Sequence, residues 1–87
     1  MPYTVLEVSP TPNPNALKFV LDRIIASDPV SFFSKEAAAA HPVASRLFEI
    51  HGIASLLILN DFITVNRDPT IEWRSITGKV RTALKKV

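Results

Sequence analysis

The chain has 87 residues, of which 47% are apolar and 21% are charged, and its formal net charge is +2. This composition excludes an intrinsically disordered chain and indicates one globular domain, which we expect to span residues 1–87. None of the residues is cysteine, so the chain has neither a disulfide framework nor a thiolate with which to hold a metal.

The first third of the chain predicts three short strands. Residues 3–8 alternate loosely between apolar and polar side chains, and residues 16–21 resume an extended pattern with apolar side chains on one face. Residues 9–15 between them are rich in proline, which cannot donate a ladder hydrogen bond, so this segment is expected to be a connection. Residues 30–33 contain β-branched and aromatic side chains and predict a third strand.

Residues 34–50 predict two short helices or one broken helix. Ser34, followed by two charged residues and four alanines, is typical of a helix start, whereas Pro42 interrupts the pattern and residues 43–50 resume helical spacing. We expect Gly52 to form a left-handed C-terminal cap, because glycine lacks the Cβ that makes positive φ costly.

The clearest hairpin signal lies in the next segment. Two runs rich in apolar and β-branched residues, 53–59 and 62–66, flank the polar pair Asn60-Asp61, which suits a two-residue turn. We expect these strands to be central in the sheet and covered on at least one face. The longer run is far shorter than the roughly 20 residues that span a bilayer, so we expect no membrane contact.

We expect a C-terminal helix to begin at Asp68-Pro69, where Asp suits the N-cap and Pro the first helical position. Apolar residues then recur every three or four positions, which predicts one buried stripe, with cations on the opposite side. Residues 67–87 carry a net charge of +4, whereas residues 1–66 carry −2. Together the elements predict an α+β, two-layer domain with helices packed on one face of a mostly antiparallel sheet.

Three separated segments resemble the N-terminal domain of Nfu-type, or NifU-like, iron-sulfur cluster scaffold proteins. They are Thr-Pro-Asn-Pro-Asn-Ala-Leu-Lys-Phe at residues 11–19, Ala-Ser-Arg-Leu-Phe-Glu-Ile-His-Gly-Ile at residues 44–53, and Asp-Phe-Ile-Thr-Val at residues 61–65, followed by Trp73. In longer members, this domain precedes a separate domain whose Cys-x-x-Cys motif holds a bridging cluster, and these 87 residues contain no such motif. The resemblance therefore implies a docking, targeting or regulatory role, in which an iron-sulfur cluster is reached only through a partner.

Two surfaces are candidates for partner binding. The first is the proline-stiffened loop with its neighbour Lys18, because a stiff loop loses little entropy when a partner docks; the loop residues are Pro12, Asn13, Pro14 and Asn15. The second is the C-terminal helix, with Trp73, Arg74, Arg81 and Lys85, because Trp and Arg are common energetic anchors. The structural alternatives are that the loop only sets the register of two strands, that Lys18 is solvated, and that Trp73 fills the core.

No enzymatic or metal chemistry is predicted. The serines lack a Gly-x-Ser-x-Gly pattern, the two glycines are 26 residues apart, and His41 and His51 have no acidic neighbour at metal-ligand spacing. We therefore expect no catalytic residue, no metal site and no directly bound cofactor.

Taken with these absences, the family resemblance implies a non-enzymatic interaction module associated with iron-sulfur cluster assembly or delivery. Its expected partners are assembly or client proteins, or a separate Cys-x-x-Cys scaffold domain. The first residues do not form a basic and then apolar leader, so we expect a cytoplasmic location. The alternative is a small basic nucleic-acid-binding domain that uses the C-terminal helix, although no aromatic pair interleaves its charges as a base-stacking platform requires.

Overall fold

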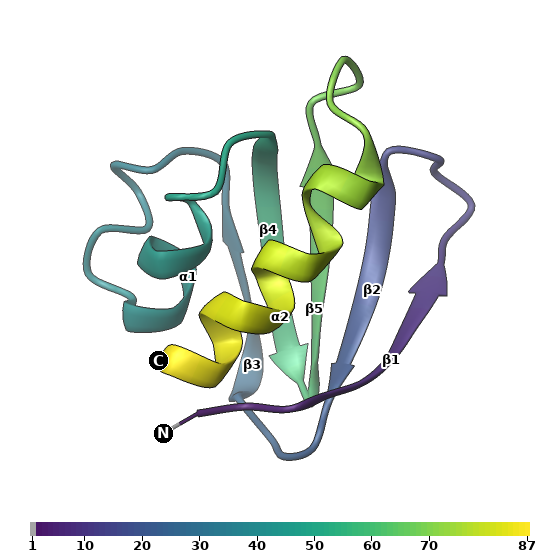
Figure 1. Ribbon diagram of the computed structural model, residues 1–87. Helices are drawn as coiled ribbons and strands as arrows, with labels where there is room; N and C mark the ends of the chain where they lie inside the picture. Colours follow the sequence, from purple (N-terminus) through teal and green to yellow (C-terminus); the bar gives the residue numbers. More distant parts are fainter. Residues whose placement is uncertain (1) are drawn as a thin grey trace.

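Residues 2–87, which the computed structural model describes, form a five-stranded antiparallel sheet with two α-helices across one of its faces (Figure 1). The strand order is β1-β2-β5-β4-β3, and the strands are β1 (Val5–Pro10), β2 (Ala16–Leu21), β3 (Ala26–Phe32), β4 (Ile53–Asn60) and β5 (Phe62–Arg67). The helices are α1 (Pro42–Leu47) and α2 (Thr77–Lys86), and a 3₁₀ turn, η1 (Trp73–Ser75), precedes α2. The predicted α+β class is confirmed.

The hairpin of β4 and β5 lies in the middle of the sheet, as predicted. β5 pairs with β2 on one side, and β4 pairs with β3 on the other. Leu59 pairs with Phe62, so Asn60 and Asp61 form the two-residue turn. Asn60 has a φ of +51°, a left-handed conformation that asparagine tolerates. The proline-rich segment is a connection, as expected, and the strands on either side of it, β1 and β2, pair as a hairpin.

Both outer strands are interrupted. The register of β1 against β2 shifts between Val5 and Glu7. The register of β3 against β4 shifts between Ala26 and Val30, where Pro29 cannot donate to the ladder. β3 therefore begins earlier than the predicted residues 30–33. Pro29, which interrupts the sequence pattern, lies inside the strand and not before it.

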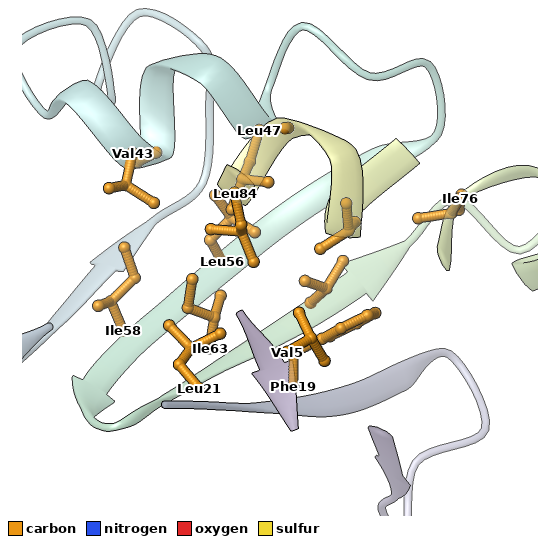
Figure 2. Close-up of a cluster of buried hydrophobic side chains, with 14 of the residues drawn as sticks. Val5, Phe19, Leu21, Val43, Leu47, Leu56, Ile58, Ile63, Ile76 and Leu84 are labelled. Atoms are coloured by element: carbon orange, nitrogen blue, oxygen red, sulfur yellow. The ribbon is translucent and has the colours of Figure 1, made fainter. Parts of the chain in front are cut away.

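The core lies between the sheet and the helices. Alternate side chains of the inner strands point towards the helices and are fully buried, among them Phe19, Leu56 and Ile63. Figure 2 shows Leu47 from α1 and Leu84 from α2 in the same cluster. No polar or charged residue among residues 2–87 is buried as a whole. Apolar burial, at about 1.5–3 kcal/mol for each large side chain, therefore holds the two layers together.

The predicted helix start at Ser34 is wrong, because residues 34–40 form a series of turns. Ser34 Oγ accepts the N–H of Ala37 at 3.1 Å, as a helix N-cap does. However, Pro42 disfavours the α conformation of the residue before it, and His41 is extended, with φ −100° and ψ 113°. His41 then caps α1 itself, since its Nδ1 accepts the N–H of Ala44 at 3.1 Å.

The predicted helix start at Asp68-Pro69 is also wrong, because α2 begins at Thr77. Asp68 accepts the Thr70 N–H at 2.9 Å and the Thr70 hydroxyl at 2.7 Å, so it caps a turn. Arg67 Nη1 donates to the Ile71 carbonyl at 2.9 Å and ties the following loop to the end of β5. Trp73 and Arg74 therefore lie in η1 and not on the face of α2. Within residues 2–87, neither helix is long and apolar enough to cross a membrane.

Gly52 has the predicted left-handed conformation, with φ +105°, but it does not cap α1. That helix ends at Leu47, with Phe48 as its C-cap, and Gly52 instead turns the chain into β4. A Cβ on Gly52 would lie 2.8 Å from Cγ2 of Ile71, too close for two carbon atoms. The position therefore requires glycine both for its backbone conformation and for the packing of Ile71.

The substitution Gly52→Ala should lower the free energy of unfolding by about 2–3 kcal/mol, because the added methyl group introduces both backbone strain and a clash. Gly78→Ala is the matched control, since a Cβ on Gly78 in α2 meets no neighbouring atom within 4 Å. It should raise the free energy of unfolding by up to about 1 kcal/mol. Urea denaturation followed by circular dichroism measures both values. A Gly52→Ala protein as stable as the wild type would contradict the packing described above.

Two exposed carboxylates stabilise local structure through their charged form. The Thr4 N–H donates to Asp22 Oδ1 at 3.1 Å and holds the pKa of Asp22 below its ordinary value of 3.8, with a smaller contribution from Arg23. The Thr70 N–H and hydroxyl hold the pKa of Asp68 below its ordinary value in the same way. These two groups therefore link stability to pH.

Because both pKa values are lower in the folded chain, the stability they add is complete above the unfolded value near 3.8 and is lost as pH falls through the folded values. Thermal denaturation from pH 7 to pH 2 should show the melting temperature falling below about pH 4. The Asp22→Asn Asp68→Asn protein should show a shallower fall. Asp28→Asn, at an exposed residue of β3, should follow the wild type, and equal slopes for all three would refute the assignment.

Candidate functional site

The proline-rich loop is held in one shape by its own side chains. The Thr11 hydroxyl is placed to donate to two carbonyl oxygens, that of Asn13 at 2.9 Å and that of Ala16 at 3.1 Å. It also accepts the Asn13 N–H at 3.1 Å. Asn13 Oδ1 accepts the Asn15 N–H at 2.9 Å. These bonds support the structural alternative for the loop, in which it fixes the hairpin of β1 and β2. Its Pro12, Asn13 and Pro14 are nevertheless exposed.

Trp73 contacts this loop, although 59 residues separate it from Pro14. The Trp73 Nε1 donates to the Pro14 carbonyl at 3.2 Å, and the half-buried ring packs against the core. The Arg67 guanidinium lies 5.4 Å from the centroid of the indole ring, within cation–π range. The Nε of Arg67 is buried and has no hydrogen-bond partner. Arg67, which the sequence reasoning did not single out, therefore joins β5 to η1.

Lys18 and Arg74 are each engaged by a neighbouring side chain. Lys18 lies on the sheet face opposite Phe19, and its Nζ is 4.4 Å from the centroid of the Phe62 ring. The Arg74 Nε lies 2.6 Å from the Glu72 carboxylate, and both side chains are exposed. An exposed pair of this kind contributes at most about 1 kcal/mol. Neither Lys18 nor Arg74 lines the groove described next.

A groove of about 500 Å³ lies where the end of α1 and the segment after it meet α2. Three cations line it, Arg46 from α1 and Lys79 and Lys86 from α2. Glu49 is the one acidic residue of the lining. None of these four side chains forms a salt bridge within residues 2–87. The groove therefore concentrates positive charge that the folded chain leaves uncompensated.

The inner surface of the groove is small and partly apolar. Ile50 and Ala83 line it, and Gly78 leaves space where another residue would place a side chain. Thr82 adds a hydroxyl, which donates to the Gly78 carbonyl at 3.0 Å. The groove can therefore hold an apolar side chain beside a negatively charged one.

The groove includes only part of the predicted basic helix surface. Arg81 and Lys85 are exposed on α2 but do not line the groove. Arg46 and His51 do line it, and neither was predicted as a site residue. The helical spacing of Lys79, Thr82 and Lys86 marks one side of α2, but only the packing of α1 beside α2 makes that side concave.

Residues 2–87 contain no group of three or more acidic, histidine or cysteine side chains that could hold a metal ion. The arrangement of charges in the groove suits electrostatic recognition of a partner. That the chain has no catalytic residue and binds no cofactor directly stays a prediction.

The chain is similar to known proteins in sequence over most of its length. Residues 6–87 match the protein family described as "Scaffold protein Nfu/NifU N terminal". The human protein named "NFU1 iron-sulfur cluster scaffold homolog, mitochondrial" is 34% identical over 73 residues, which are 82% of this chain and 29% of the human protein. A NifU-like protein of Schizosaccharomyces pombe is 36% identical over 75 residues, which are 80% of this chain and 28% of that protein. The chain thus spans less than a third of the length of these relatives.

Solved structures show the same fold. The solution NMR structure of a NifU-like protein from Saccharomyces cerevisiae aligns with a TM-score of 0.82 and 27% identity, over 92% of this chain and 74% of that one. A crystal structure of a Staphylococcus aureus protein aligns with a TM-score of 0.79 over 92% of this chain and 96% of that one, and at 20% identity it shows the fold alone. Because the family match covers residues 6–87, including all three segments that carried the resemblance, this chain belongs to the Nfu/NifU N-terminal family of scaffold proteins.

Proposed function

We propose that this chain is a non-enzymatic docking or regulatory module in iron-sulfur cluster assembly or delivery, and that a partner holds the cluster. The family, and the human relative named as an iron-sulfur cluster scaffold homolog, support the link to this process. Cysteine is the usual ligand of such clusters, and none of the 87 residues is cysteine. This composition supports assigning the cluster to the partner.

The observation that carries the docking role is the basic groove between α1 and α2. Its cations Arg46, Lys79 and Lys86 have no salt bridge within residues 2–87, so no ion pair of the folded chain neutralises them. Uncompensated charge around a small apolar surface suits a polar protein interface of opposite charge. The partners on this proposal are assembly proteins, cluster-containing client enzymes, or a separate Cys-x-x-Cys scaffold domain.

A protein partner suits the groove better than nucleic acid does. Glu49 in the lining repels a phosphate backbone, and no Phe, Tyr or Trp lines the groove to stack on a base. The exposed Arg81 and Lys85 add positive charge nearby, but an isolated basic surface also attracts acidic proteins.

The location of the protein determines which partners it meets. The human relative is named as mitochondrial, as are relatives from Drosophila. The cytoplasmic location expected from the first residues stays a prediction.

A cross-linked pull-down of the tagged protein from the organism that encodes it tests the docking role. The experiment is run with and without nuclease, at low and moderate salt, and the recovered proteins are identified by mass spectrometry. We expect cluster-assembly proteins or cluster-containing enzymes to be enriched regardless of nuclease, with less recovery at higher salt because the contact is electrostatic.

The control bait is the tag alone. Recovery of the same proteins by both baits would mark them as bound to the tag. Nuclease-sensitive recovery of nucleic-acid-bound proteins, without iron-sulfur partners, would replace the proposed function with the nucleic-acid alternative.

A further inference from the structure

We propose that the groove between α1 and α2 binds an acidic helical segment of the partner protein, with carboxylates on Lys79 and Lys86 and one apolar side chain between them. This inference rests on the proposed docking function and names the chemistry of the partner. It also moves the contact from the predicted Arg81 and Lys85 to the side of α2 that faces α1.

The spacing of the two lysines indicates the spacing of the partner's carboxylates. Lys79 and Lys86 are seven residues apart in α2, which is about 10.5 Å along the helix axis at 1.5 Å per residue. Two acidic residues seven positions apart on a partner helix have the same separation and lie on nearly the same face. Arg46 stands on the opposite wall and can contact the same segment from the other side.

The space between the lysines suits an apolar side chain. Gly78 and Ala83 line this part of the groove with little side-chain volume, and Ile50 adds an apolar surface from the segment after α1. A leucine placed between the two acidic residues of the partner would contact these residues. Burial of such a side chain favours binding, because it removes apolar surface from water.

Glu49 restricts which acidic segments fit. Its carboxylate lies in the lining and has no salt bridge within residues 2–87. A uniformly acidic segment would place negative charge against it, and like charges in contact oppose binding. The groove is therefore expected to prefer a segment with acidic residues at two defined positions over a run of acidic residues.

The probe is a labelled 15-residue helical peptide, with two glutamates seven positions apart on either side of one leucine. A permuted peptide of the same composition, with the glutamates on opposite faces, is its control. Fluorescence anisotropy measures affinity, and amide chemical shifts of the ¹⁵N-labelled protein locate the contact. We expect shifts confined to residues 46–51 and 78–86, and weaker binding of the permuted peptide.

Two charge-reversed proteins distinguish binding of the peptide in the groove from general electrostatic attraction to the helix. Lys79→Glu Lys86→Glu and Arg81→Glu Lys85→Glu change the net charge equally on the same helix, but only the first pair lines the groove. The first should weaken peptide binding at least about tenfold, and the second less than about threefold. Equal weakening by both proteins would overturn the groove site in favour of long-range attraction.

A third variant changes shape without changing charge. Gly78→Gln places a side chain into the open space of the groove, and the absence of neighbouring atoms within 4 Å of its Cβ means that the fold accommodates it. The protein should stay as stable as the wild type and lose peptide binding. Unchanged binding by this variant would overturn the inference, and so would the absence of wild-type peptide binding at a peptide concentration of about 1 mM.

The pull-down separates failure of this inference from failure of the proposed function. If the wild type and the Lys79→Glu Lys86→Glu protein recover the same iron-sulfur assembly proteins, the groove inference is wrong and the docking function remains. If neither recovers any such protein while the peptide binds the wild-type groove, the groove binds acidic segments and the proposed function is wrong. Tighter binding of a single-stranded oligonucleotide than of the peptide at the same residues would overturn the acidic-segment assignment.

Discussion

The structure depends on covering one face of the β4–β5 hairpin. Leu56, Ile58, Ile63 and Val65 project from that face, and all are fully buried. Neither helix is long enough to be stable alone, because isolated helices shorter than about 12–15 residues are marginal in water. α1 and α2 are therefore helical because they bury apolar stripes on this face (Figure 2). Two short helices side by side on a sheet leave a hollow between them at the outer surface. The basic groove is this hollow.

Local patterns predicted the sheet well and the helix boundaries poorly. The alternation of apolar residues in the strands and the Asn60-Asp61 turn are patterns that each span only a few residues. Such local patterns can be recognised in the sequence without knowing which distant segments pack together. Ser34 and Asp68 also have the chemistry of helix caps, and each does accept a nearby backbone N–H. However, the same bond caps an isolated turn, and only distant contacts decide whether a helix follows. After Asp68 such contacts are made by its own N–H, which donates to the Gly52 carbonyl at 2.8 Å, and by Trp73, which donates to the Pro14 carbonyl; together they hold residues 68–72 as a loop.

The candidate site was predictable only as a charged helix. Counting cations on α2 locates its polar face, but the position of α1 decides which side of that face becomes a groove. Arg46 and His51 belong to the site through tertiary packing, and no spacing in the sequence connects them with Lys79 or Lys86. The loop at residues 12–15 and Trp73 were predicted as partner-binding residues from their residue types. In the structure, a hydrogen bond joins Trp73 to this loop. The family resemblance provided the link to iron-sulfur proteins, which residue chemistry alone did not.

The interrupted outer strands have a consequence for the behaviour of the protein in concentrated solution. A sheet with two free edges offers unpaired N–H and C=O groups on which another chain can add as a strand, which is how fibres grow. Here Pro10 ends one outer strand and Pro29 lies within the other, and each strand has a shift in register. Neither edge is therefore a straight template, so end-to-end polymerisation through the sheet is disfavoured. On the proposed docking function, contact with a partner through the helical face would leave both sheet edges open to solvent without promoting the addition of further strands.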